Sequence, residues 1–189
     1  MNDLLALRPP EGFGCIVCDP PWAFAARSPK GYARSAQRHY ACTSLDWIEA
    51  LPVRDLAAPD CLLWLWATNP MLPQALHVLG SWGFRYVTAG HWAKRGRSGK
   101  LAFGTGFVLR CAGEPFLIGA RGAPKVGSRS VRSVIEAPRR EHSRKPDEAY
   151  AAAEALTPGV ARLDMFSREA RPGWTTWGAE AGKFDQVAA

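Results

Sequence analysis

The residues best suited to do chemistry in this chain are a carboxylate, two prolines and a tryptophan in succession, Asp19-Pro20-Pro21-Trp22. They follow an apolar run, Cys15–Cys18, that is typical of a buried strand. The prolines fix φ, lack N–H donors and hold Asp19 in an extended conformation. The carboxylate and a proline carbonyl can each accept one N–H of an exocyclic amine, while Trp22 stacks on the attached ring. The alternative is an ordinary polar turn with a surface tryptophan.

Such a site would also activate the amine that it binds. The lone pair of an aromatic amine is delocalised into the ring, which makes the nitrogen a poor nucleophile. Two acceptors on its N–H groups favour a pyramidal nitrogen and stabilise the positive charge that develops during attack. The sequence therefore points to group transfer onto the amine of a flat, base-like substrate.

The tetrapeptide resembles the Asp-Pro-Pro-Trp signature of the MT-A type of N6-adenine methyltransferases. This family includes the catalytic subunit of the messenger-RNA adenosine methyltransferase, and its bacterial and phage members methylate adenine in DNA. The resemblance implies S-adenosyl-L-methionine as the cofactor, with Asp19, Pro20, Pro21 and Trp22 as the catalytic residues. A target base within a duplex would have to be flipped out of the stack.

Two later segments extend the resemblance to roughly residues 14–180. Ser143-x-Lys145-Pro146-Asp147-Glu148 is similar to the family's Ser-x-Lys-Pro-Asp-Glu. Residues 163–180 are similar to a family segment that lines the cofactor pocket. Ala179 replaces the asparagine of that pattern, and Asp164 replaces its glutamate. The cofactor-binding residues implied are Asp19, Lys145, Phe166, Ser167, Arg168, Ala179 and Glu180. Read without the family, Lys145 is equally well a solvated lysine ahead of a helix.

The nucleic acid would be contacted by aromatic, polar and basic residues. The resemblance makes Tyr40 a candidate for packing on the target base, although an ordinary loop aromatic fits as well, and Arg110 and Glu114 match polar positions of the family. Residues 121–145 hold eight basic and two acidic residues, a net +6 of the chain's formal +7. This charge predicts phosphate contacts that position a polyanion without reading its sequence. The residues expected to make them are Arg129, Arg132, Arg139 and Arg140; a merely solubilising loop and a basic dimer interface are the alternatives.

The hydrophobic pattern predicts the elements that must position these residues. Continuous apolar runs predict buried strands at 15–18, 61–67, 85–94, 115–120 and 161–166, with a short strand at 174–178. Ser44 can cap a helix from Leu45 to Leu51, Pro70 can open a helix with Leu72, Leu76 and Leu79 toward the sheet, and Pro146 can open a third helix. Strand, helix and strand in succession imply parallel crossovers. The predicted fold is α/β, a doubly wound mostly parallel sheet resembling the class I (Rossmann-like) methyltransferase fold, with its motif order permuted.

Length and composition set the remaining expectations. A chain of 189 residues with 47% hydrophobic residues suits one domain, with a core at 14–180 and a frayed tail at 181–189. Apolar runs are too short to cross a bilayer, so a cytoplasmic protein is expected. Five cysteines without a second Cys or His pair predict buried thiols and no metal site.

The sequence-based hypothesis is therefore an adenine-N6 methyltransferase acting on nucleic acid, with DNA favoured over RNA because compact members are typical of bacteria and phages. An RNA enzyme remains the alternative for the substrate. A non-catalytic nucleic-acid-binding subunit of the same fold and a methyltransferase for free nucleotides or a protein amine are the competing functions. A homodimer is possible.

Overall fold

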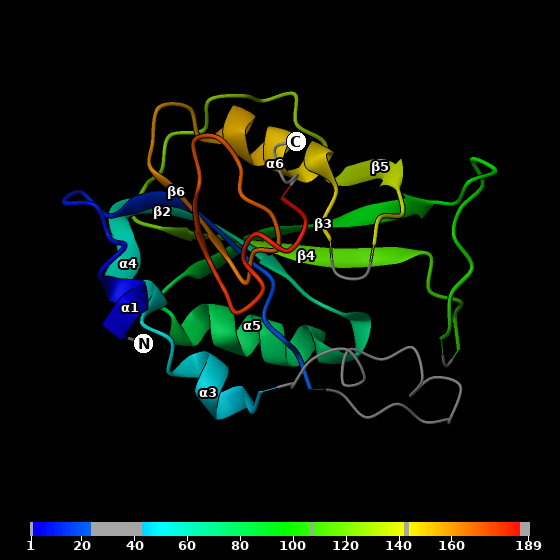
Figure 1. Ribbon diagram of the computed structural model, residues 1–189, viewed down its shortest axis with the longest axis horizontal. Coiled ribbons are helices and arrows are strands. Elements are labelled where there is room, and N and C mark those ends of the chain that lie inside the picture. The colour runs from blue at the N-terminus through cyan, green and yellow to red at the C-terminus, as the bar shows by residue number, and fades with distance from the viewer. Residues whose placement is uncertain (1, 24–42, 107, 142–143, 186–189) are drawn as a thin grey trace.

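A computed structural model describes residues 2–23, 43–106, 108–141 and 144–185, which are organised around one sheet (Figure 1). Its strands lie in the spatial order β5-β3-β4-β2-β1-β6-β7. They are β1 (Phe13–Cys18), β2 (Ala57–Trp66), β3 (Arg85–Arg95), β4 (Gly113–Arg121), β5 (Val134–Pro138), β6 (Arg162–Met165) and β7 (Thr175–Trp177).

The sheet is mostly parallel, as predicted. β1 pairs in parallel with β2 and β6, β6 with β7, and β3 with β5. β4 runs antiparallel to both β2 and β3, so among the described strands it is the one that points the other way. β2 and β3 are parallel, as their connection through a helix implied, but β4 lies between them.

Helices cover both faces of the sheet, which confirms the doubly wound α/β architecture (Figure 1). They are α1 (Asn2–Leu5), α3 (Leu45–Glu49), α4 (Val53–Leu56), α5 (Leu72–Ser81), preceded by the 3-10 turn η2 (Asn69–Met71), and α6 (Asp147–Leu156). Side chains of α1, α3, α4 and α5 share one core cluster, and those of α6 belong to the cluster on the opposite face.

Strand alternation divides the apolar side chains between these two cores. In β1, Ile16 and Cys18 pack on the α5 side, whereas Cys15 and Val17 pack on the α6 side. Because successive strand residues point to opposite faces, a continuous apolar run serves a sheet covered on both sides. Burial keeps Cys15 as a neutral thiol by raising its pKa to about 11.

The local predictions for the helices are confirmed in part. Ser44 caps α3, with its hydroxyl accepting a hydrogen bond from the Trp47 N–H at 3.2 Å. In α5 the buried residues are Ala75, Val78 and Leu79, whereas Leu76 is 45% exposed. The prediction that Leu76 faces the sheet is therefore wrong, because α5 buries Ala75 and Val78 beside Leu79 and leaves Leu76 on its exposed side.

The structure also contains elements that the sequence did not predict. β5 lies within the basic segment 121–145, and α4 precedes β2. β5 alternates exposed and buried residues, but it is only 5 residues long and sits among charges, so its period-2 signal is weak. Among the described residues, no helix has the length and apolar character that crossing a membrane requires.

Candidate active site

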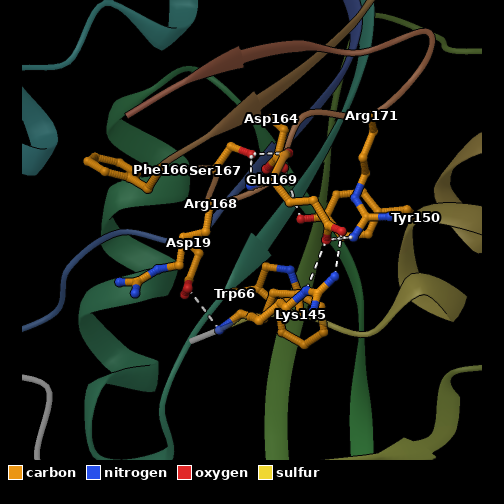
Figure 2. A pocket seen from close by; sticks show the side chains of 11 residues that line it. Asp19, Trp66, Lys145, Tyr150, Asp164, Phe166, Ser167, Arg168, Glu169 and Arg171 are labelled. Carbon is orange, nitrogen blue, oxygen red and sulfur yellow. Dashed lines mark hydrogen bonds and ion pairs between the residues drawn. The ribbon is translucent and has the colours of Figure 1, made fainter. Parts of the chain in front are cut away.

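The candidate site lies where β1 and β6 end side by side. After β1 the chain continues to β2, which lies on one side of the β1–β6 pair. After β6 it continues to β7, which lies on the other side, so the two connections leave in opposite directions. Ligands of open α/β sheets bind in the crevice at such a switch point, beyond the carboxyl ends of the strands. The N–H of Asp19, just after β1, donates to the carbonyl of Met165 at 3.3 Å. The pocket there (Figure 2) is lined by Asp19, Trp66, Arg144, Lys145, Tyr150, Asp164, Phe166, Ser167, Arg168, Glu169 and Arg171.

A chain of alternating charges runs into this pocket. Lys145 Nζ lies 2.8 Å from Asp19 Oδ2 and 3.2 Å from Glu114 Oε2, and Lys94 Nζ lies 3.1 Å from Glu114 Oε1. The Lys145 side chain is only 6% exposed and lies 5.2 Å from the centroid of the Trp66 ring. The structure thus brings together three residues predicted for the site, Asp19, Lys145 and Glu114, and adds Lys94.

The charges of this chain support one another against burial. Burial raises the pKa of Asp19, and the Lys145 ammonium counteracts part of that rise. Burial would also raise the pKa of Glu114, but Lys145 and Lys94 outweigh it and hold that pKa at about 2. The pKa of Lys145 is raised despite its burial, because two carboxylates face it. Lys145 is therefore a permanent cation at the floor of the pocket.

Trp22 does not present a stacking surface in this structure. It is 3% exposed, belongs to the core cluster on the α5 side, and donates its indole N–H to the Trp66 carbonyl at 3.0 Å. In this structure the ring anchors the turn to β2, and the stacking of Trp22 on a substrate ring stays a prediction. The Pro20 carbonyl accepts the Trp22 N–H at 2.8 Å and the Pro21 carbonyl accepts the Thr43 N–H at 3.3 Å. Each of these carbonyls keeps a second lone pair.

The end of β6 forms the opposite wall of the pocket. Phe166 has a φ of 62°, the left-handed region that a bulky residue rarely adopts. Its ring packs against Trp47 and Trp177, with centroids 6.2 and 5.2 Å apart. The strained backbone turns the chain sharply into the pocket, where Ser167 is buried. Figure 2 shows Phe166, Ser167 and Arg168 following one another around this wall.

Two further predicted cofactor-binding residues, Ala179 and Glu180, follow β7. Glu180 Oε2 lies 2.7 Å from Arg168 Nη1, so these two predicted cofactor residues pair with each other. Ala179 is exposed. A methyl side chain at that position offers no polar group to a ligand.

A buried carboxylate that the sequence did not single out as a site residue also lines the pocket. Asp164, in β6, is 3% exposed and accepts a hydrogen bond from the Tyr150 hydroxyl at 2.9 Å. Burial raises its pKa to about 7, although hydrogen bonds from Tyr150 and Ser167 oppose the rise. The guanidinium of Arg171 lies 3.8 Å from the centroid of the Tyr150 ring. Tyr150 lies one turn after the predicted start of α6, but its direction depends on how that helix packs.

Arginines and acidic side chains close the pocket on the α6 side. Arg171 bridges Asp147 at 2.7 Å and Glu169 at 2.9 Å. Arg140 lies 2.6 Å from Asp147 Oδ1 and also donates to the Lys145 carbonyl at 3.2 Å. Glu169 further pairs with Arg144. Glu169 and Arg171 carried no sequence signal strong enough to be predicted.

The predicted nucleic-acid contacts divide into two groups. Arg110, Arg129, Arg132 and Arg139 are exposed, as phosphate contacts require. Arg140 is only 17% exposed in its side chain and is held in the arginine network, so the structure does not present it as a phosphate contact. Tyr40 lies outside the described residues.

The sequence was compared with protein families and with curated proteins. Residues 13–180 match the family model MT-A70. The chain is 28% identical to the Type II methyltransferase M.MunI of a Mycoplasma species over 95% of this chain and 82% of that protein. It is 31% identical to the human N(6)-adenine-specific methyltransferase METTL4 over 99% of this chain and 41% of that protein.

A fungal relative is similar over most of this chain as well. The chain is 32% identical to the N6-methyladenosine RNA methyltransferase MTA1 of Cryphonectria parasitica over 92% of its own length and 53% of that protein. The chain thus spans about half or less of METTL4 and MTA1 but most of M.MunI. The match of the family model to nearly the whole chain, together with the Asp-Pro-Pro-Trp turn at the end of β1, shows that this chain belongs to the MT-A70 family.

Proposed function

We propose that this chain transfers a methyl group from S-adenosyl-L-methionine to the N6 amine of adenine in nucleic acid, with DNA favoured. The observation that carries the proposal is the position of Asp19. Its carboxylate stands at the switch point of the sheet, 2.8 Å from the buried Lys145 ammonium, at the end of a strand in a chain of the MT-A70 family. A carboxylate at the end of a buried strand loses hydration without serving the core, so a ligand is the physical reason for its position.

The side chains of the pocket fit the proposed cofactor. S-adenosyl-L-methionine carries a carboxylate, an ammonium, a ribose and an adenine, and it supplies a methyl group that is already activated by its bond to a sulfonium. Lys145 has three N–H donors and lies within ion-pair distance of two carboxylates, Asp19 and Glu114, so a third donor would be available to hold the cofactor's carboxylate. Phe166 offers an aromatic face. Arg168 and Glu180 offer charged groups for the ribose hydroxyls, provided that their mutual ion pair rearranges.

Asp19 and the Pro20 carbonyl would hold the two N–H groups of the target amine. The Pro20 oxygen keeps one lone pair after accepting the Trp22 N–H. This arrangement orients the nitrogen lone pair away from both acceptors and toward the methyl group. Because the methyl group arrives activated, positioning would supply most of the rate enhancement.

Asp19 is also placed to receive a proton. As N6 bonded the methyl carbon, the bond from that carbon to the sulfonium would break and leave a neutral thioether. N6 would then carry the positive charge and would return to neutrality by losing one of its protons. Burial raises the pKa of Asp19, which makes this carboxylate a better proton acceptor than an exposed one, while the Lys145 ammonium favours its ionised form. Asp19 would thus bind the amine first and accept its proton afterwards.

DNA is favoured because the relative of comparable length is a bacterial Type II methyltransferase, of which the alignment covers 82%. RNA is the specific alternative, because MTA1 is named as an RNA methyltransferase at 32% identity. A non-catalytic subunit with this fold is disfavoured by the intact Asp-Pro-Pro-Trp turn.

The test is methyl transfer from labelled S-adenosyl-L-methionine to matched DNA and RNA oligonucleotides, followed by digestion to nucleosides. The expected product is N6-methyldeoxyadenosine. Asp19→Asn should lower the rate by at least about 100-fold, because an amide is a weaker acceptor and not a base. Asp55→Asn, a change of an exposed carboxylate, is the matched control. Equal rates for the parent and Asp19→Asn would contradict the assignment, and methylation of RNA alone would move the substrate to RNA.

A further inference from the structure

The described residues of the loop between β3 and β4, 96–106 and 108–112, include exposed apolar side chains. Phe103, Val108 and Leu109 are 80%, 84% and 82% exposed. Large apolar side chains scattered singly over a surface are normal, but three on one short loop concentrate exposed apolar surface there, which is typical of an interaction site. Figure 1 shows this loop extending beyond the sheet where β3 ends and β4 begins.

The same loop is strongly basic. The stretch from residue 95 to 112 contains four basic residues, Arg95, Arg97, Lys100 and Arg110, and no aspartate or glutamate. Arg95 pairs with Glu136 at 2.7 Å, whereas Arg97, Lys100 and Arg110 are exposed. Exposed cations interleaved with exposed apolar side chains suit a polyanion that also carries flat apolar groups.

One face of the Phe103 ring already carries a cation. The Arg110 guanidinium lies 5.4 Å from the ring centroid, within the range of a cation–π contact. With 80% of the residue exposed, ring surface remains available to a second flat group. A base that stacked on Phe103 would place its phosphate within reach of Arg110.

The loop is fixed at its base to the candidate active site. The Ala102 N–H donates to the Lys94 carbonyl at 2.7 Å, and the Lys94 N–H donates to the Ala112 carbonyl at 2.9 Å. Gly104 donates to the Cys111 carbonyl at 2.8 Å, and a Cβ at position 104 would lie 2.8 Å from that oxygen, so this narrow hairpin requires glycine there. Lys94 is the first member of the charge chain that leads through Glu114 to the pocket.

We propose that the described residues of this loop, 96–106 and 108–112, form an arm that binds nucleic acid beside the target adenine, with Phe103 stacking on an unpaired base and Arg97, Lys100 and Arg110 contacting the phosphates around it. This inference rests on the proposed function for the identity of the target. Single-stranded nucleic acid is bound by this combination of an aromatic platform and a basic track. A protein partner fits less well, because it would have to neutralise three cations that the loop itself leaves without acidic neighbours in sequence.

Binding of a fluorescein-labelled single-stranded DNA oligonucleotide tests the arm independently of catalysis. Phe103→Ala should weaken binding about 5- to 150-fold, the range for loss of one stacked base, and leave the salt dependence unchanged. Phe103→Trp should retain affinity. The Arg97→Ala/Lys100→Ala double variant should lower the slope of log affinity against log salt by about 1.4. Leu76→Ala, which truncates an exposed apolar side chain on α5, is the control and should bind like the parent.

The outcomes separate this inference from the proposed function. Parent affinity in Phe103→Ala, with N6-methylation intact, would overturn the arm and leave the function standing. Weaker binding by Phe103→Ala in a protein that methylates no oligonucleotide would support the arm and overturn the function. Analytical sedimentation of the parent and Phe103→Ala tests whether a second copy of this chain, rather than nucleic acid, binds the loop. A dimer that the variant loses, with oligonucleotide affinity unchanged, would make this surface an interface between two copies and overturn the proposal.

Discussion

The ammonium of Lys145 lies 2.8 Å from the carboxylate of Asp19, so the two most distinctive motifs of the sequence meet at one point. Asp19 directly follows the first strand, and Lys145 precedes the last helix. Their ion pair stabilises the charge of Asp19, which is proposed to hold the target amine, and fixes the position of Lys145, which is proposed to hold the cofactor. Substitution of either residue should therefore affect the other, and stability as well as activity.

Lys145→Met should destabilise the fold and weaken cofactor binding. Removal of the cation leaves the buried Asp19 without its Lys145 counter-charge and Glu114 with Lys94 alone, which costs about 3–5 kcal/mol of the free energy of unfolding at pH 7. The affinity for S-adenosyl-L-methionine should fall about 10- to 150-fold by calorimetry, as expected for loss of one charged hydrogen bond. Lys145→Arg, which keeps the charge, is the control for stability.

The pH dependence of the Lys145→Met effect has a definite sign. Lys145 and Lys94 hold the pKa of Glu114 at about 2 in the folded chain. The stability that the Glu114 carboxylate contributes is therefore fully present above the pKa that this carboxyl has in the unfolded chain, and it is lost as the pH falls toward 2. In Lys145→Met the carboxylates take up protons at higher pH, which relieves their burial. The difference in stability between the parent and the variant should therefore shrink from pH 7 toward pH 4. A constant difference would contradict the charge chain.

Asp164→Asn should flatten the dependence of stability on pH. Burial raises the pKa of Asp164 to about 7, so the folded chain keeps a proton that the unfolded chain has lost above about pH 4. The contribution of Asp164 to the free energy of unfolding is therefore greatest below pH 4 and is lost as the pH rises to 7, a change of about 4 kcal/mol. The asparagine oxygen can still accept the Tyr150 hydrogen bond. Urea titrations between pH 4 and pH 8 measure the free energy of unfolding of the parent and the variant. If both depend on pH in the same way, the raised pKa of Asp164 is contradicted.

The Trp22→Phe variant distinguishes two roles of Trp22, anchoring the turn to β2 and stacking on the target base. The substitution removes the hydrogen bond to the Trp66 carbonyl and part of a buried ring, so the free energy of unfolding should fall by about 1–3 kcal/mol. The KM for the oligonucleotide should stay within about 2-fold of the parent, since nothing that touches the base has changed. A large rise in KM without loss of stability would restore the stacking role.

Arg139 and Arg140 are a matched pair of neighbours with different expected roles. Arg139→Ala should lower the slope of log affinity against log salt for oligonucleotide binding by about 0.7 to 0.9, the value for one phosphate contact. Arg140→Ala should leave the slope unchanged and lower stability by about 1–3 kcal/mol, because it removes the side-chain donor to the Lys145 carbonyl and one of the two arginines that face Asp147. The reverse pattern would show that the arginine network opens to bind phosphate.

The sequence by itself determined the features whose physical causes are local. Proline geometry after an apolar run places Asp19 at the end of a buried strand, and Pro146 with two acidic residues marks the start of α6. Continuous apolar runs in β1 and β2 indicated a sheet covered on both faces, which the two core clusters confirm. A period of two or 3.6 residues is visible in any short window, so these elements needed no knowledge of their neighbours.

Tertiary structure decided which side chains meet and which are buried. The Trp22 indole could have faced a ligand or the core, and packing against β2 places it in the core. Lys145 could have been solvated, and two carboxylates from β1 and β4 capture it. Arg139 and Arg140 are chemically equivalent in sequence, but only Arg140 lies near an acidic side chain of α6. These outcomes depend on contacts between distant segments, and the energy of a charge depends on its partners and its burial rather than on its neighbours in sequence.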